Sequence, residues 1–166
     1  MDRAGPITAA AATLSPLHVR PERCPAWWVL GSRYTLLLTS EDSGGACSLF
    51  EVVVAPGRGP ALHVHRREDE TFHVLAGEIE FNAGGQPIHA EPGSVVFAPR
   101  GIAHGFHNVG TDEARLLCLA MPGGLEQFFT EAGVPAGDRT SLPPTPTPED
   151  IQRLLQAALN HGIEAA

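Results

Sequence analysis

The chain has 166 residues, of which 43% are hydrophobic and 18% charged, a composition that suits one globular domain with its own core. Its formal net charge is −8, and all 11 basic residues are arginine. Proteins that hold a phosphate backbone or an anionic membrane surface need a basic face, so we expect neither nucleic acid nor a membrane as a partner.

The cysteines and the N-terminus indicate the compartment. The three cysteines, Cys24, Cys47 and Cys118, form no CxxC pair, and an odd number of scattered cysteines is not a disulfide framework. The N-terminus has no basic region followed by a long apolar segment. We therefore expect a reduced, cytoplasmic protein. Cys118 lies in an apolar run, which favours a small buried residue without a metal role.

In chain order, residues 1–25 are rich in Ala and Pro and are expected to form an N-terminal arm. Residues 26–122 then show the pattern of an all-β domain, in which short apolar runs are separated by Gly, Pro and acidic residues. A hairpin turn is expected at 41–45, and the apolar run 94–98 is expected to be buried. The predicted strands are 33–39, 48–55, 62–65, 70–75, 78–82, 88–91, 94–98 and 114–121.

Residues 123–166 are expected to form a C-terminal helical extension. The first helix, 125–132, carries an apolar stripe that packs on the core or closes one mouth of the β-domain. A Pro-rich connector, 142–148, leads to an amphipathic second helix at 149–160, which Thr147 is placed to cap.

Four side chains in the middle of the chain are candidate metal ligands. His63 and His65 are two apart on a strand and so point to the same face. Glu70 can join them from the same hairpin, and His104 from a strand brought alongside. By the same alternation, His107 points away from His104. Three neutral imidazoles and one carboxylate suit a divalent first-row metal.

The two stretches that carry these residues resemble the paired motifs of the cupin superfamily. The first motif, G-x5-H-x-H-x(3,4)-E-x6-G, is matched by Gly57, His63, His65, Glu70 and Gly77. The second, G-x5-P-x-G-x2-H-x3-N, is matched by Gly93, Pro99, Gly101, His104 and Asn108. More widely, the chain is similar to bacterial single-domain cupins described as quercetin dioxygenase-like.

The resemblance implies an all-β fold, a single small jelly-roll β-barrel with C-terminal helices, and a metal held inside by His63, His65, Glu70 and His104. It also implies a metal-dependent dioxygenase that acts on a small aromatic or enolic, flavonol-like substrate. Glu70 would then also be catalytic, as the acceptor of the substrate hydroxyl proton. The implied cofactor is one divalent first-row transition metal: Fe, Ni, Mn, Co, Cu or Zn.

Inward-facing apolar residues are expected to form a cavity wall that suits a flat apolar ligand. These residues are Phe50, Val52, Phe72, Phe81, Phe97, Phe106 and Met121. Arg100 lies near the expected mouth, where it either holds an anionic group or is a solvated turn residue.

Other functions stay open at this point. The same fold serves non-catalytic proteins that bind a metal or a small ligand, and it also serves isomerases and cyclases. A third alternative is a purely structural metal. Because an edge strand of a small barrel needs covering, we expect a homodimer, with residues 1–25, Trp27 and Trp28 as its contact elements.

Overall fold

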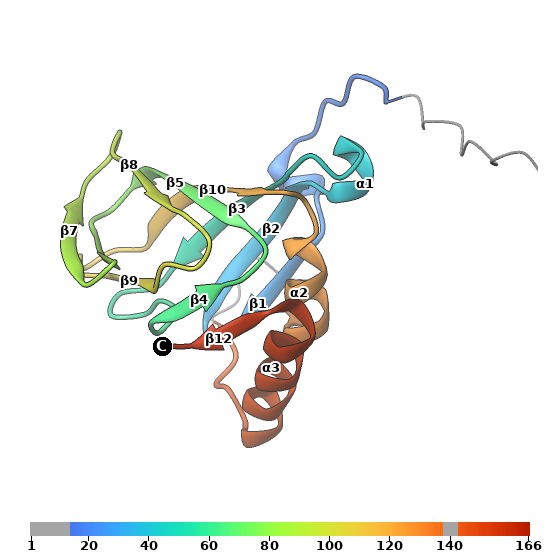
Figure 1. Ribbon diagram of the computed structural model, residues 1–166. Coiled ribbons are helices and arrows are strands. Elements are labelled where there is room, and N and C mark those ends of the chain that lie inside the picture. The colour runs from blue at the N-terminus through green and yellow to red at the C-terminus, as the bar shows by residue number, and fades with distance from the viewer. Residues whose placement is uncertain (1–13, 138–142) are drawn as a thin grey trace, which may run out of the picture.

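The computed structural model describes residues 14–137 and 143–166. Residues 1–13 of the expected arm, and the first residue of the expected connector, lie outside these ranges. The described part of the chain forms two antiparallel β-sheets, with two helices packed at one end (Figure 1). No helix in these ranges is long and apolar enough to cross a membrane.

The larger sheet has seven strands and carries most of the core. Its order is β11 (Val134–Pro135), β1 (Ala26–Val29), β2 (Ser32–Leu38), β3 (Ser48–Val54), β10 (Ala114–Met121), β5 (Asp69–Ala76) and β8 (Val95–Ala98). The five-stranded sheet has the order β12 (Ile163–Ala165), β4 (His63–His65), β9 (His104–Asn108), β6 (Ile79–Ala83) and β7 (Gln86–Ala90).

This topology confirms the predicted all-β, jelly-roll fold. The two sheets are separate hydrogen-bonded units and do not close into one continuous barrel. The inward faces of both sheets contribute to one apolar core, whose most buried side chains include Phe50, Val54, Val74, Phe81 and Leu116. The alternation of side chains along a strand decides which residues reach this core. On β5, Glu70, Phe72 and Val74 are buried, whereas His73 is exposed.

Strand β8 corrects the expectation that residues 94–98 are buried throughout. Val96 and Ala98 are buried, but Val95 is 64% exposed and Phe97 is 56% exposed. Nothing in the described ranges covers the outer face of this strand. Residues 95–98 include no polar residue, so the pattern gives no contrast between the two faces of the strand and predicted burial for both.

The expected hairpin turn at 41–45 contains a single helical turn, α1 (Ser40–Ser43). The Thr39 side chain accepts from the backbone N–H of Asp42, and the Asp42 carboxylate accepts in return from the Thr39 N–H. Gly44 ends the helix in the left-handed region at φ 64°. This reciprocal capping box is the reason that a polar Ser-Glu-Asp-Ser segment becomes helical.

The C-terminal elements bear out the two predicted helices, and they add a strand. Helices α2 (Leu125–Ala132) and α3 (Pro148–His161) pack against each other at one end of the two sheets (Figure 1). Thr147 caps α3 as expected, through bonds shared with Asp150. After α3 the chain turns back as β12, which pairs with β4 so that Ile163 lies opposite His65. The sequence did not predict this strand.

Candidate metal centre

The structure brings the four candidate metal ligands together. His63 and His65 come from β4, and His104 comes from β9, where it pairs in register with His63. Glu70 reaches them from β5 in the other sheet. The ligand atoms of these four residues all lie within 4.8 Å of one another. The cluster therefore joins the two sheets at a single point.

Each imidazole has its outer nitrogen occupied by an acceptor. Nδ1 of His63 lies 2.8 Å from the Ala61 carbonyl oxygen, and Nδ1 of His104 lies 3.0 Å from that of Ile102. Nδ1 of His65 lies 3.3 Å from Oε2 of Glu68, a carboxylate that is only 5% exposed. Because carbonyl and carboxylate oxygens only accept, each Nδ1 carries the proton and each Nε2 keeps its lone pair.

These lone pairs converge on one point. Nε2 of His63 lies 3.1 Å from Nε2 of His65, and Oε2 of Glu70 lies 2.8 Å from Nε2 of His104 and 3.2 Å from Nε2 of His65. Acceptor atoms this close repel one another unless a cation or shared protons lie between them. Three imidazole nitrogens and one carboxylate oxygen are also a donor set that first-row divalent metals prefer. The residues present therefore fit a metal ion.

The electrostatics act in opposite directions on His63 and His65, and they favour the ionised form of Glu70. Burial lowers the pKa of His63 to about 4, so this imidazole is neutral at neutral pH. Burial also lowers the pKa of His65, but the carboxylates of Glu70 and Glu68 outweigh it and the net shift is upward. For Glu70, burial opposes ionisation, yet His65 and the hydrogen bond with His104 bring its pKa down to about 2. Glu70 is thus an ionised carboxylate in an otherwise apolar interior.

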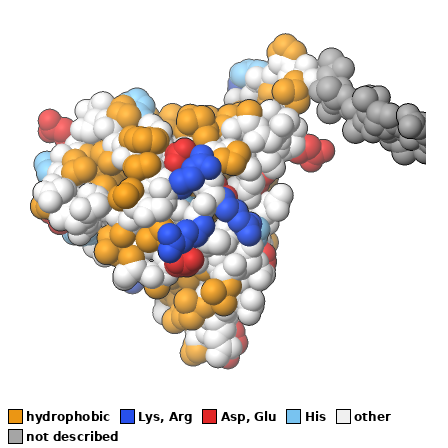
Figure 2. Space-filling model, in the orientation of Figure 1, with side chains coloured by type: hydrophobic (Ala, Val, Ile, Leu, Met, Phe, Trp, Pro, Cys, Tyr) orange, Lys and Arg blue, Asp and Glu red, His pale blue; other side chains and the backbone are white. Residues whose placement is uncertain are grey.

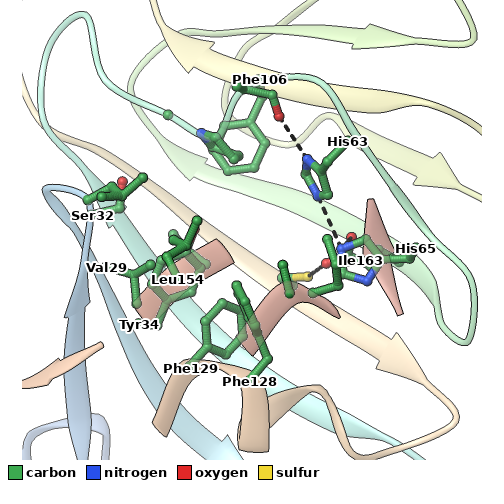
Figure 3. Close-up of a pocket in the computed structure, with 18 of the residues that line it drawn as sticks. Val29, Ser32, Tyr34, His63, His65, Phe106, Phe128, Phe129, Leu154 and Ile163 are labelled. Atoms are coloured by element: carbon green, nitrogen blue, oxygen red, sulfur yellow. Dashed lines mark hydrogen bonds and ion pairs between the residues drawn. The ribbon is translucent and has the colours of Figure 1, made fainter. Parts of the chain in front are cut away.

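A cavity of about 260 Å³ opens beside the cluster. Three of the residues predicted for its wall line it: Val52, Phe72 and Phe106. Figure 3 shows Phe106, Phe128 and Phe129 around this space, with His63 and His65 on one side. Phe128 and Phe129 belong to the apolar stripe of α2, so this helix both packs on the core and closes the cavity.

Four of the predicted wall residues lie elsewhere. Phe50 and Phe81 are buried in the core behind the wall, where Phe50 packs edge-on against Phe129 and Phe81 packs against Phe72. Phe97 and Met121 are exposed on the outer face of the seven-stranded sheet, Met121 by 40%. Their strands alternate, and the inward positions belong to small residues such as Ala98 and Ala120, which leave room for the cluster.

Several residues around the cavity were not predicted for it. Cys118 is buried as expected, but its Sγ also lies 3.2 Å from Oε1 of Glu70, where the thiol donates to the carboxylate. Glu68 holds His65, as described above. Ser32 and Tyr34 of β2 also line the cavity. The alternation of β2 places Ser32, Tyr34 and Leu36 on one face, and that signal was sufficient to find them.

Arg100 has a structural contact instead of a free guanidinium. Its side chain donates to both carboxylate oxygens of Asp69, at 3.0 and 2.7 Å, and to the carbonyl oxygen of Met121 at 3.2 Å. The Arg100 backbone N–H also donates to Asp69. These bonds tie the corner at residues 99–101, which precedes His104, to the start of β5. Arg100 therefore links the corner that precedes His104 to the strand that carries Glu70.

Comparison with known proteins places the chain in a family. Residues 50–120 match the family model described as "Cupin domain". The chain is 30% identical to "Polyketide synthase CurC" of Streptomyces cyaneus over 120 residues, which are 68% of this chain and 77% of that protein. This chain belongs to the cupin superfamily.

Further relatives carry different names. The "Oxalate-binding protein" of Thermotoga maritima is 30% identical over 84 residues, covering 50% of this chain and 69% of that protein. The "Quercetin 2,3-dioxygenase" of Aspergillus japonicus is 26% identical over 149 residues, covering 82% of this chain and 42% of that protein. A solved structure described as a predicted oxalate decarboxylase from Thermotoga maritima matches with a TM-score of 0.61 and 22% identity, over 64% of this chain and 99% of that one.

Proposed function

We propose that this protein is a metal-dependent dioxygenase that acts on a small aromatic or enolic, flavonol-like compound. His63, His65, Glu70 and His104 hold one divalent first-row metal: Fe, Ni, Mn, Co, Cu or Zn. The observation that carries the proposal is the convergence of three Nε2 lone pairs and one ionised carboxylate at the wall of an apolar cavity. The similarity to a quercetin 2,3-dioxygenase and to a polyketide synthase supports this substrate class.

A metal bound at this centre supplies Lewis-acid polarisation of a substrate oxygen. The protein residues have separate tasks. Val52, Phe72 and Phe106 hold a flat ring and exclude water from it. Glu70 is ionised, so it accepts the proton of a substrate hydroxyl. The Cys118 thiol holds Oε1 of Glu70, which keeps Oε2 directed at His65 and His104.

The experiment that tests this proposal has two readouts. Elemental analysis of the purified wild-type protein, of Glu70→Ala and of His104→Ala gives the metal content and its identity. Oxygen uptake with flavonol as the substrate gives the activity. We expect about one first-row metal ion per wild-type chain, loss of metal from both variants, and oxygen uptake only by the wild-type protein. A wild-type protein that takes up no metal after reloading contradicts the proposal.

A second candidate function is a cupin that binds a metal or a small ligand without turnover, and a cupin isomerase or cyclase is the related alternative. The similarity to an oxalate-binding protein favours it. A non-catalytic protein gives a heat of ligand binding in calorimetry with no oxygen consumed and no new product.

We also propose that the protein forms a homodimer. Of the expected contact elements, Trp28 is only 8% exposed and packs against Ala26 and Ala136 of its own chain. A more exposed apolar surface lies on the outer face of the seven-stranded sheet, where Val95, Phe97 and Met121 are 64%, 56% and 40% exposed. Figure 2 shows hydrophobic side chains gathered over the end of the molecule that carries β7 and β8. An exposed apolar edge favours association with a second copy. Light scattering tests this: wild type is expected at twice the chain mass, and Phe97→Glu at the chain mass. A monomeric wild type refutes it.

A cytoplasmic location is part of the same proposal. Cys47 and Cys118 are free thiols, as expected in a reducing compartment. Cell fractionation tests the location, and recovery of the protein outside the cytoplasm contradicts it.

A further inference from the structure

The cavity has a second polar end, away from the metal centre. Figure 3 shows Ser32 and Tyr34 on the side of the cavity opposite His63 and His65. The residues between the two ends are almost all apolar, including Phe72, Phe106, Phe128, Phe129 and Leu154. A ligand that fills this space therefore has an apolar middle and meets polar groups at both ends.

Tyr34 is held in one orientation. In the register of β2 and β3 it lies opposite Val52, which lines the cavity, and paired residues of neighbouring strands share a face. Its ring stacks on Phe129, with ring centroids 4.1 Å apart and an interplanar angle of 19°. An anchored ring loses little conformational freedom when a ligand binds to its hydroxyl.

The Tyr34 hydroxyl is available as a hydrogen-bond donor. Within residues 14–137 and 143–166, neither the Tyr34 hydroxyl nor the Ser32 hydroxyl has a side-chain hydrogen-bond partner. Burial raises the pKa of Tyr34, and the nearby charge of Glu70 adds to the shift, so the phenol stays protonated. A polar group in an apolar cavity gains free energy when a ligand supplies its missing partner.

The charge of the cavity restricts what that partner is. Among the described residues, those that line the cavity include no arginine, and their titratable groups apart from Tyr34 and Cys118 belong to the metal centre. A carboxylate or phosphate at the far end would therefore be buried without a counter-charge, at a high cost in desolvation. A neutral oxygen, in a hydroxyl or carbonyl group, suits this end.

We propose that Tyr34, assisted by Ser32, anchors the end of the ligand that lies away from the metal centre. The ligand is then a flat apolar molecule with one oxygen function at the metal centre and a second, neutral oxygen function at Tyr34. This inference rests on the proposed function, because it takes the histidine cluster as the reactive end.

The contacts at the far end come from other segments than the metal centre. Tyr34, Phe129 and Leu154 all lie outside residues 50–120, the part that matches the family model. The metal centre lies entirely within that part. The flanking segments therefore supply the ligand contacts at the far end.

The test compares two probes that differ at one end only. Flavonol and 4′-hydroxyflavonol share the hydroxyl–ketone end that a metal binds, and the second carries an additional hydroxyl at the opposite end. Calorimetric titration of the metal-loaded wild-type protein is expected to show tighter binding of 4′-hydroxyflavonol. In Tyr34→Phe, this affinity falls roughly 3- to 10-fold, the range for one neutral hydrogen bond, and flavonol binding is unchanged.

Tyr34→Phe keeps the ring that stacks on Phe129, and circular dichroism checks its fold. The matched control is Thr35→Val, which removes a buried, unpaired hydroxyl from the other face of β2 and should change neither affinity. An equal loss for both probes in Tyr34→Phe overturns the proposal, and so does the absence of binding to wild type. If Tyr34→Phe weakens only the binding of 4′-hydroxyflavonol and the wild-type protein consumes no oxygen, the anchoring role of Tyr34 is supported and the dioxygenase activity is refuted.

Discussion

Different parts of the chain form the two ends of the cavity, and the sequence predicted the residues of one end far better than those of the other. The metal centre comes from β4, β5 and β9, within residues 50–120, and its four residues were predicted one by one. The far end comes from β2, α2 and α3, and only the stripe of α2 was anticipated there. Metal chemistry demands particular residues at fixed spacing, whereas an apolar wall accepts many residues from any element.

The two ends are nevertheless joined physically. Strand β12 pairs directly with β4, so the C-terminal segment lies beside the strand that carries His63 and His65. Ile163 of β12 lies opposite His65 and also lines the cavity. Helix α3 leads into β12 and contributes Leu154, Leu155 and Ala158 to the same cavity. Variants that change only one end of the cavity show what each end contributes to metal binding, ligand binding or stability.

The largest effect is expected from losing a histidine of the metal centre. His104→Ala should reduce metal content from about one ion per chain to nearly none, because the remaining donors are one short of the set. His107→Ala is the matched control, since His107 lies three residues further along the same strand and is exposed on its other face. Elemental analysis of both purified variants checks this. Retention of metal by His104→Ala would remove His104 from the centre.

Replacing a phenylalanine with alanine should lower the free energy of unfolding at the cavity wall much more than on the outer face of the sheet. Phe72 is 3% exposed and contacts Phe81, Phe106 and His104, so Phe72→Ala is expected to lower the free energy of unfolding by about 3–5 kcal/mol. Phe97→Ala, at a position 56% exposed, should change it by no more than about 0.5 kcal/mol in the monomer. Urea unfolding at low protein concentration measures both. Similar losses would mean that Phe97 is covered in solution.

Glu68 should affect metal binding without touching the metal. Because Glu68 accepts the Nδ1 proton of His65, Glu68→Ala is expected to lower metal affinity by roughly 10- to 100-fold, and Glu68→Gln, which keeps an acceptor, by less. Competition with a chelator of known affinity measures this. Glu91→Ala, an exposed carboxylate before β8, serves as the control. Equal affinities of Glu68→Ala and the control would show that His65 is oriented by packing alone.

The sequence predicted most of the fold because strand alternation and turn residues are local signals. The alternation of Glu70 and Phe72 with His73 is an example, since a polar residue marked the outer face. Strand β8 has no polar residue to indicate which face points outward, so the exposure of Phe97 could not be predicted. The pairing of β12 with β4 could not be predicted either, because it joins residues about a hundred positions apart and depends on where α3 docks. Cys118 reaches Glu70 for the same reason, through the pairing of β10 with β5.

The smallest effect concerns the cap of α3, at the far end of the cavity. A hydrogen bond from the Thr147 backbone N–H, and further bonds from Arg153 and the Thr147 hydroxyl, lower the pKa of Asp150. A depressed folded-state pKa means that the stabilisation is fully present above the unfolded-state value of about 3.9 and is lost as pH falls towards the folded-state pKa.

Asp150→Asn should therefore melt slightly below wild type at neutral pH, and the two melting curves should converge as the pH is lowered below about 4. Thermal circular dichroism across this range measures the difference. Glu149→Gln, the neighbouring carboxylate outside the capping box, should not reproduce it. A gap between wild type and Asp150→Asn that persists unchanged at low pH would show that the charged form of Asp150 does not stabilise the start of α3. The wall formed by Leu154 and Leu155 would then be held by its packing against α2 alone.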